Sequence, residues 1–518
     1  MACEERTSDL PFHFEHFLHG CSSNMQIQRT SSWSHQPDPA ADSTKRIHWI
    51  AIGLNKEVEI ARDRLANAPD LKNLVDYLPP SGEAPTGVGE SLAVYPPASS
   101  NLPAILFYGL GESAKFSPLK AFEAATSASK TLASKPGRSV TVVLADSEEA
   151  ALIRGWIVGT KGPGLRKKEA NRHPFDSLTF LSHSSKLDDA QFKFAVGVGH
   201  SVNLARELGN TTPDEKCPER LAEKAAVIAS AAGCEVEVWD EQRIRAERFG
   251  GLLGVAAGSA RPPRFVILRY NGAGADSADH YSIVGKGVTF DSGGLSLKPS
   301  ASMEDMKNDM TGAAVALSVI SRLAESKVRV NVVAYMPITE NMTGGLAVKL
   351  GDVLTMRDGT TVEILNTDAE GRLILADALA YAAEQKPSAI VDLATLTGAC
   401  VVALGNRIAG LFSNDDQMAS DLSTASSHVG ERLWRMPIDE DFKDQLKSTV
   451  SDLKNVGTRW GGAITAAKFL QHFVGDCKWT HLDIAGPSWS DSESSTRDAG
   501  GTGCYVATLV NWLTDKAI

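Results

Sequence analysis

The sequence predicts an α/β protein with two domains: a smaller N-terminal α/β domain and a larger C-terminal α/β domain with a central mixed sheet flanked by helices. Two observations lead to this prediction. Short apolar runs of strand length alternate with stretches of helix length along most of the chain, which is typical of layered α/β folds. The 518 residues, 43% hydrophobic and 22% charged, also suffice for more than one globular core.

Residues 1–45 do not share this alternation and are rich in Ser, His, Gln and Asp. We expect them to form a polar, mobile N-terminal extension. A metal-binding tract is an alternative, but no clear partner ligands follow its three histidines: His13, His16 and His19. We place the N-terminal domain at residues 46–187 and the C-terminal domain at residues 188–518, beginning with a connecting helix.

Four apolar runs predict buried strands in the N-terminal domain, at residues 47–54, 104–108, 140–145 and 178–181. Between them, residues 117–134 and 148–158 have helical patterns. The first of these helices has Ser117 as a candidate N-cap and Pro118 at its first position, residue types that favour helix starts. This alternating order predicts a largely parallel sheet, followed by a polar loop at residues 166–174.

The C-terminal domain repeats the alternation with stronger strand signals. Its predicted connecting helix, residues 188–208, ends before the turn-forming residues 209–213. The remaining elements are predicted strands at residues 264–269, 281–290, 328–336, 361–365 and 389–393, and predicted helices at residues 312–325 and 373–384.

Charge and composition argue against several classes of protein. The chain carries 52 Lys+Arg and 63 Asp+Glu, a net charge of −11, which disfavours non-specific binding to nucleic acid or an anionic membrane. No run approaches the roughly 18–20 apolar residues that a membrane span needs. The seven cysteines form no CxxC motif and the N-terminus has no apolar signal-peptide core, so we expect a cytoplasmic protein.

Several familiar catalytic motifs are missing: the sequence has no GxSxG, no GxxxxGK[ST] and no HExxH. The 12 histidines also avoid residues 281–427, where the least ordinary motifs occur. Any metal bound there must therefore have mainly oxygen ligands, with lysine as a possible nitrogen ligand.

The first unusual motif is the segment 284–294, VGKGVTFDSGG. Lys286 interrupts an apolar strand, and Asp291 follows where that strand ends. A surface lysine on an edge strand is one explanation, but the apolar neighbours favour a buried position. There the amine should either lose its proton or have its charge neutralised by neighbouring groups. Gly293 and Gly294 would let the backbone approach a ligand closely.

The second motif is the segment 366–372, NTDAEGR, between a predicted strand and a predicted helix. In an extended segment Asp368 and Glu370 would point the same way, and two crowded carboxylates need a cation to stay ionised. Gly371 permits a sharp turn, which places Arg372 at the helix start. A charged loop that caps the helix is the alternative.

Together with Asp309, these motifs supply enough ligands for two divalent ions. Four carboxylates and the Lys286 amine could hold ions about 3.5–4 Å apart, as in two-metal hydrolytic sites. Nearby dications would lower the pKa of Lys286 until its neutral nitrogen can bind metal. Lys298 could stabilise an oxyanion, although spacing alone favours a solvated loop lysine.

These motifs resemble the leucyl (cytosol) aminopeptidase family of two-metal peptidases. The octapeptide 366–373, NTDAEGRL, is similar to the family signature, and the similarity extends over residues 190–518. The resemblance implies that Asp291, Asp368 and Glu370 hold one ion, together with the main-chain carbonyl of Asp368. It implies that the second ion is held by Lys286, Asp291, Asp309 and Glu370.

The resemblance also implies the remaining roles. Water between the ions would attack the scissile carbonyl, Lys298 would assist at its oxygen, and Arg372 would hold a proton-shuttling bicarbonate. The substrate's free amine would bind a metal and restrict cleavage to the N-terminal residue. Four residues match the family's pocket for the side chain of the substrate's N-terminal residue: Met306, Thr395, Gly398 and Ala485. For Met306 and Ala485, a role in the hydrophobic core is the alternative. The following residues 487–490 depart from the aliphatic pattern expected there.

The sequence is therefore interpreted as a two-metal aminopeptidase that removes leucine and other apolar residues from peptides. We expect neither nucleic acid nor membranes as partners. The resemblance implies a homohexamer with two divalent ions per subunit; manganese suits the oxygen ligands best, and zinc or magnesium are alternatives. The rival hypothesis is a DNA-binding accessory or regulatory protein of the same family, which the net charge of −11 disfavours. An inactive scaffold is disfavoured because every matched site residue is present.

Overall fold

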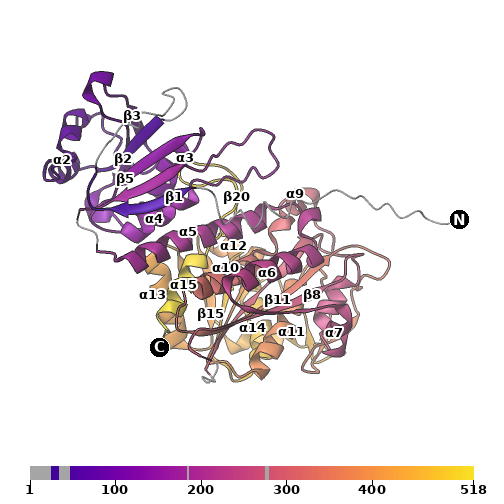
Figure 1. Ribbon diagram of the computed structural model, residues 1–518. Coiled ribbons are helices and arrows are strands. Elements are labelled where there is room, and N and C mark those ends of the chain that lie inside the picture. The colour runs from indigo at the N-terminus through magenta and orange to yellow at the C-terminus, as the bar shows by residue number, and fades with distance from the viewer. Residues whose placement is uncertain (1–24, 34–46, 184–185, 275–278, 518) are drawn as a thin grey trace.

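The computed structural model describes residues 25–33, 47–183, 186–274 and 279–517 (Figure 1). His13, His16 and His19 lie outside these ranges. Two sheets with helices on their faces confirm the predicted two-domain α/β class. None of the described helices is long and apolar enough to cross a membrane.

The N-terminal domain is built on a six-stranded sheet whose only antiparallel pair joins its edge strand β3 to β4. In spatial order the strands are β1 (Gln26–Thr30), β6 (Ser177–Leu181), β5 (Arg138–Val143), β2 (Ile47–Asn55), β4 (Ala104–Gly111) and β3 (Ser91–Val94). Successive residues of β2 face opposite sides: Trp49 and Ala51 enter one core, and Ile50 and Ile52 enter the other. Both faces are covered, as expected for a mainly parallel sheet.

Helices cover the two faces of this sheet. Helices α3 (Pro118–Leu132) and α4 (Glu149–Val158) pack on the Trp49 face, and α2 (Val58–Ala66) packs on the Ile50 face. The predicted start of α3 is confirmed, because the Ser117 hydroxyl accepts a hydrogen bond from the Lys120 amide at 3.4 Å.

Strand β1 corrects one prediction. It falls inside residues 1–45, yet it pairs in parallel with β6 over all five of its residues. The prediction of a mobile extension is therefore wrong for this stretch. Ile27 packs against the adjacent core, so the strand joins the sheet edge despite its polar composition.

Helix α5 (Asp189–Asn210) joins the domains and packs against α4 on one side and α10 (Thr311–Glu325) on the other (Figure 1). It begins with a capping box, in which Asp188 accepts from the Gln191 amide at 2.8 Å and Gln191 accepts from the Asp188 amide at 2.9 Å. The predicted connecting helix is therefore confirmed.

The C-terminal domain contains a nine-stranded mixed sheet. Strands β9 (Tyr281–Gly285), β11 (Asn331–Asn341), β14 (Ala389–Ala394) and β18 (Trp479–Asp483) form its parallel centre. Short strand β10 (Gly287–Asp291) also runs parallel to β11. The remaining strands flank this centre: β7 (Glu235–Trp239) and β8 (Arg264–Asn271) on one side, β15 (Ala409–Ser413) and β16 (Leu433–Arg435) on the other.

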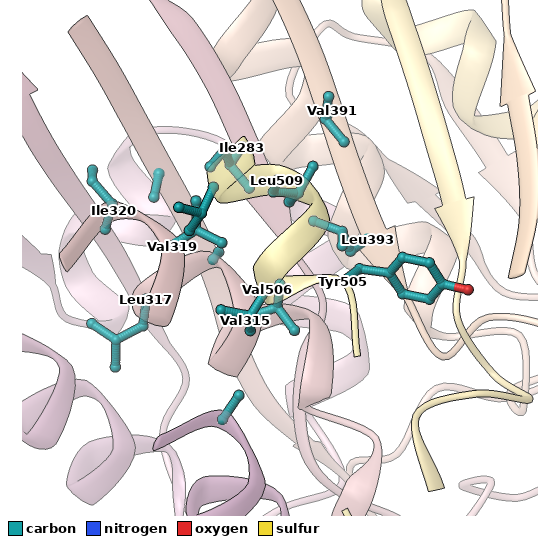
Figure 2. Packing of buried hydrophobic residues seen from close by; sticks show 14 of the residues in the cluster. Ile283, Val315, Leu317, Val319, Ile320, Val391, Leu393, Tyr505, Val506 and Leu509 are labelled. Atoms are coloured by element: carbon teal, nitrogen blue, oxygen red, sulfur yellow. The ribbon is translucent and has the colours of Figure 1, made fainter. Parts of the chain in front are cut away.

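Two apolar clusters hold helices against the two faces of this sheet. On one face, Val315 and Val319 of α10 and Leu509 of α15 (Val506–Thr514) pack on Ile283 of β9 and Val391 of β14 (Figure 2). The same cluster includes helices α6 (Pro218–Ala232) and α13 (Asp416–Val429). The other face is covered by helices α8 (Gly250–Ala256), α11 (Gly371–Glu384) and α14 (Gly462–Gln471).

Smaller elements complete the domain. A three-stranded sheet consists of β12 (Val353–Thr355), β13 (Thr361–Glu363) and β17 (Leu453–Lys454), in that order, and lies beside the start of α11. Because β9, β10, β11, β14 and β18 run the same way, their carboxyl ends lie at one edge of the large sheet. Ligand sites of open α/β sheets commonly lie at such an edge.

Candidate active site

Lys286 lies at a break in the central sheet. We expected one strand at residues 281–290, but the chain forms β9 up to Gly285 and β10 from Gly287. The Lys286 amide donates to the Leu393 carbonyl at 3.0 Å, and its carbonyl accepts from the Ala313 amide at 2.9 Å. Glycines are needed on both sides because a Cβ at Gly285 would lie 2.4 Å from the Gly312 carbonyl oxygen, and one at Gly287 would lie 2.5 Å from that of Pro337.

The Lys286 side chain is buried among carboxylates. Its Nζ lies 2.7 Å from Oδ1 of Asp309 and 2.8 Å from Oε1 of Glu370, and it donates to the Thr395 carbonyl at 3.0 Å. Burial alone would lower the pKa of Lys286, but attraction to Asp309, Glu370 and Asp291 outweighs it and raises that pKa above its usual value. Lys286 is therefore buried as predicted, and of the two outcomes expected for its charge the structure shows compensation by neighbouring carboxylates.

Three buried carboxylates converge on this position. Asp291 ends β10, Asp309 follows the 3-10 turn η5 (Met306–Asn308), and Glu370 precedes α11. One oxygen of each lies within 4.8 Å of the others. Burial is the main reason why the pKa values of Asp309 and Glu370 are raised, and Asp291 adds to both shifts.

Two oxygens in this cluster have no hydrogen-bond partner: Oδ2 of Asp309 and Oε2 of Glu370. Buried carboxylate oxygens without a donor are costly unless a cation binds them. The donor set, with several carboxylates and one amine, suits hard or borderline divalent ions. The residues present therefore fit the metal site that the sequence predicts.

Asp291 is held on both of its oxygens. Oδ1 accepts from the Gly293 amide at 2.8 Å and from Nδ2 of Asn341 at 2.7 Å, while Oδ2 lies 2.9 Å from Nζ of Lys298. Gly293 has φ +85°, and a Cβ there would lie 2.8 Å from Oδ1 of Asp368. Only glycine therefore fits at this position beside Asp368.

We expected Asp368 and Glu370 to lie in an extended segment, but they do not. Residues 366–369 form a turn, in which the Asp368 amide donates to Oδ1 of Asn366 at 2.9 Å. The side chains consequently reach different lysines: Asp368 lies 2.5 Å from Nζ of Lys298, whereas Glu370 reaches Lys286. Lys298 is thus a largely buried ion-pair partner and not a solvated loop lysine.

Arg372 lies in the first turn of α11, as predicted. Its Nη1 donates to the Asn455 carbonyl at 2.8 Å, and its buried Nε has no hydrogen-bond partner. Burial lowers the pKa of Arg372 to about 10, although Glu370 and Asp483 oppose that shift. A buried guanidinium with an unused donor is suited to binding a small anion.

The four predicted pocket residues come from three segments near this centre. Thr395 is in direct contact, since its hydroxyl donates to Oδ1 of Asp309 at 2.7 Å. Met306 is half-buried and begins η5, while Ala485 is half-buried just beyond β18. Gly398 is exposed at the start of α12 (Gly398–Leu404). Only Thr395 therefore has a hydrogen bond to the carboxylate cluster among these four.

Two asparagines that we did not predict join the site segments. Asn341, at the end of β11, bonds Asp291 and also donates to the Thr367 carbonyl at 3.0 Å. Asn455 donates to the Asn366 carbonyl at 2.6 Å, and its own carbonyl accepts from Arg372. The position of Asn341 at the end of a strand could have indicated a site residue. No comparable motif surrounds Asn455 in the sequence.

Comparisons with known proteins match nearly the whole chain. The model of the cytosol aminopeptidase family, catalytic domain, matches residues 203–510. A probable cytosol aminopeptidase of Rhodopirellula baltica is 44% identical over 438 residues, covering 84% of this chain and 85% of the relative. A tomato leucine aminopeptidase mutant has a TM-score of 0.81 at 33% identity, covering 95% of this chain and 96% of the other. The bottromycin maturation enzyme BotP, in complex with Mn, has a TM-score of 0.77 at 32% identity, covering 91% and 99%.

Proposed function

The chain belongs to the cytosol aminopeptidase family and is an aminopeptidase, and we propose that it uses two divalent ions to release leucine and other apolar N-terminal residues from peptides. The observation that most supports metal use is the buried cluster of Asp291, Asp309 and Glu370, with two carboxylate oxygens that lack hydrogen-bond donors. The similarity to a tomato leucine aminopeptidase supports leucine as a preferred residue.

We assign one ion to Asp291, Asp368 and Glu370, and the other to Lys286, Asp291, Asp309 and Glu370. Asp291 and Glu370 would thus be shared. When bound, such ions polarise a carbonyl and lower the pKa of water towards neutrality. Manganese is our first choice because oxygen ligands suit it and because BotP was solved with Mn; zinc and magnesium are alternatives.

The side chains around this centre supply the other requirements of peptide hydrolysis. Lys298 carries a proton on Nζ, because attraction to nearby carboxylates, Asp291 foremost, overcomes burial and raises its pKa. We propose that this ammonium donates to the scissile carbonyl oxygen as negative charge develops there. Arg372 would bind bicarbonate through its unused Nε–H, placing a proton acceptor beside the reacting water.

We propose that Met306, Thr395, Gly398 and Ala485 surround the first side chain of the peptide. Their segments flank the carboxylate cluster, and the hydroxyl of Thr395 contacts it directly. An apolar pocket beside the centre would favour leucine, while the substrate's free amine would bind a metal and limit cleavage to the N-terminal bond.

Activity on a panel of aminoacyl amides would test this function. The protein should be reconstituted with Mn, Zn or Mg in turn and assayed on leucyl, alanyl and glutamyl amides. We expect fastest release from leucyl amide and no release from N-acetyl-leucyl amide. Equal rates on the acetylated and free substrates would contradict an aminopeptidase, and equal rates with and without chelator would contradict the metals.

Replacing Lys298 by Ala should lower kcat while metal content stays at the wild-type level. Removal of one donor to a developing oxyanion typically costs about 10²–10³-fold in kcat. Turnover and metal analysis on the same preparation would test this. Lys307→Ala is the control, because Lys307 is a lysine of η5 whose amine lies over the ring of Trp489 and has no proposed catalytic role. Loss of metal in Lys298→Ala would make Lys298 a structural residue.

Replacing Asn341 by Ala should weaken metal binding, because Asn341 fixes Asp291 and the turn that contains Asp368. Losing a residue that orients a metal ligand typically costs about 10–100-fold in metal affinity. Competition with a chelator dye would measure this. Asn331 lies at the other end of β11, where it accepts from the Ala273 amide, and Asn331→Ala is a matched control. Unchanged metal affinity in Asn341→Ala would overturn the role.

We further propose a homohexamer in the cytoplasm, with an N-terminal domain of residues 46–187, whose sheet β1 joins, and a C-terminal domain of residues 188–518. Strongly exposed apolar side chains, including Val402 at 89% and Leu346 at 83%, support subunit contacts. The relatives' names support the compartment. The DNA-binding alternative has no support from these comparisons. Native mass spectrometry should give six chains; a monomer would contradict the assembly.

A further inference from the structure

A second candidate site lies between the two domains, separate from the carboxylate cluster. It is a cavity of about 160 Å³ with walls from α3 and α4 of the N-terminal domain, from α5, and from residues 429–432 and 496–507 of the C-terminal domain. None of the proposed metal ligands lines it. We propose that this cavity binds a small carboxylate with a short apolar chain.

The charges of the cavity favour an anion. Five arginines line it but only three carboxylates do, although the whole chain has a net charge of −11. Two of these carboxylates are already paired: Glu123 lies 3.0 Å from Arg407, and Asp498 lies 2.7 Å from Arg206. The third, Glu431, accepts from the Tyr505 amide at 2.6 Å and so caps the start of α15.

Two of the remaining guanidinium groups are bonded to main-chain carbonyls. Arg154, which is 7% exposed, donates to the Val429 carbonyl. Arg497 donates to the Pro487 carbonyl at 3.0 Å and to that of Trp489 at 3.3 Å. Carbonyls satisfy N–H donors but do not cancel the charge. Burial lowers the pKa of both groups, although the charge of Glu431 opposes that shift at Arg154 and nearby acidic groups oppose it at Arg497. A bound carboxylate would add negative charge to a wall on which arginines still outnumber carboxylates.

Other parts of the wall favour an apolar chain of limited size. Phe122, Val158 and Val202 contribute apolar surface. The hydroxyl of Thr126 is buried there without a hydrogen-bond partner, so the wall also has an unused polar group. An engineered cavity of about 150 Å³ accommodates benzene, which indicates room for a molecule of similar size. Free valine and a simple branched acid share the required chemistry.

An occupant would touch both domains and a segment that leads to the active site. Pro487 lines the cavity, and the next residue, Ser488, accepts from Nδ2 of Asn308 at 3.0 Å. Asn308 directly precedes the proposed ligand Asp309. Because the cavity needs both domains, the ligand should bind only the folded chain. Binding should then shift the unfolding equilibrium towards the folded state and raise the Tm.

Titration of the metal-loaded enzyme with 3-methylbutanoate, followed by calorimetry and by Tm, would test the proposal. We expect one site per chain and a rise in Tm. Valine is the second probe; it differs only by its α-amine, so its relative affinity shows whether an amino acid is preferred. The neutral 3-methylbutanamide should bind about tenfold more weakly or worse, because it cannot form charge-assisted hydrogen bonds.

Two cavity variants and one control variant test whether 3-methylbutanoate binds in this cavity or elsewhere. Arg497→Gln should weaken 3-methylbutanoate binding about tenfold or more without changing kcat/KM in its absence. Leu119→Trp, which fills the cavity from its rim, should abolish binding and keeps the test valid if Arg497→Gln folds poorly. Arg166→Gln, which removes an exposed arginine that pairs with Glu215 outside the cavity, should bind normally. Wild-type affinity in Leu119→Trp, or equal affinity for acid and amide, would overturn the proposal.

Discussion

Glu370→Gln should nearly abolish peptide hydrolysis while leaving the fold intact. We propose that Glu370 is shared by both ions, so the substitution removes negative charge from each of them. Loss of a residue that merely orients a ligand typically costs about 10–100-fold in activity or metal affinity. Loss of a shared ligand should cost more than this range, that is, more than about 100-fold in kcat. Steady-state kinetics and metal content per chain would measure both effects.

The fold should tolerate this change because the Glu370 carboxylate is not favourably placed as an anion. Burial and the charge of Asp291 raise its pKa above the usual value, so a neutral amide of the same shape should be accepted. The metal-free Tm should stay close to wild type. Glu384→Gln, at the other end of α11, is the matched control and should retain full activity. Near-normal kcat in Glu370→Gln with two ions bound would contradict the shared role.

Lys286→Arg should bind one ion tightly, bind the other poorly and lose most activity. A lysine nitrogen can bind metal only when neutral, whereas the guanidinium remains protonated at every accessible pH. The structure adds a steric reason: a single added Cβ at Gly371 would lie 2.6 Å from Cε of Lys286, so a bulkier head group has little space. Lys286→Met, which is neutral and has no nitrogen, separates loss of a ligand from an added positive charge.

Protonation of Lys286 should also make metal affinity depend on pH. Carboxylates outweigh burial and raise the pKa of Lys286, and burial raises that of Asp309, so both groups hold protons more tightly than usual in the metal-free chain. Metal binding must release these protons, so affinity should fall as pH falls. Metal titrations at several pH values should show a shallower dependence in Lys286→Met. Two tightly held ions in Lys286→Arg, with wild-type pH dependence, would show that Lys286 is no ligand.

Local sequence signals predicted many elements well. The predicted helix at residues 312–325 is α10 (Thr311–Glu325), and Ser117 caps α3 as expected. Helix α6 (Pro218–Ala232) was not predicted, although it has Pro218 at its first position and Gly233 at its C-cap with φ +95°. Such caps act within one turn of the chain, which is why they can be recognised from residue type and order.

The predictions that failed depended on neighbouring elements. Residues 281–290 have the apolar composition of one strand. The strand is divided into β9 and β10 at Lys286, whose amide donates to the Leu393 carbonyl and whose carbonyl accepts from the Ala313 amide. Lys298 is buried because Asp291 and Asp368 surround its amine, and spacing along the chain contains no information about these contacts. The turn around Asp368 is different, because it rests on a local bond to Asn366, two residues away, which the residue type at 366 could have indicated.

The sequence by itself determined the α/β class, the family resemblance and the identity of the chemical groups, because these follow from residue type and order. Only the tertiary structure decided which groups meet. Asp291 ends β10 at the carboxyl edge of the large sheet, and η5 and the start of α11 bring Asp309 and Glu370 beside it. Burial there raises the pKa values of Asp309 and Glu370. The tertiary structure also gave Asn341 its place beside Asp291 and formed the arginine-lined cavity between the domains. Distance and desolvation govern electrostatic energies, and both are properties of the folded chain.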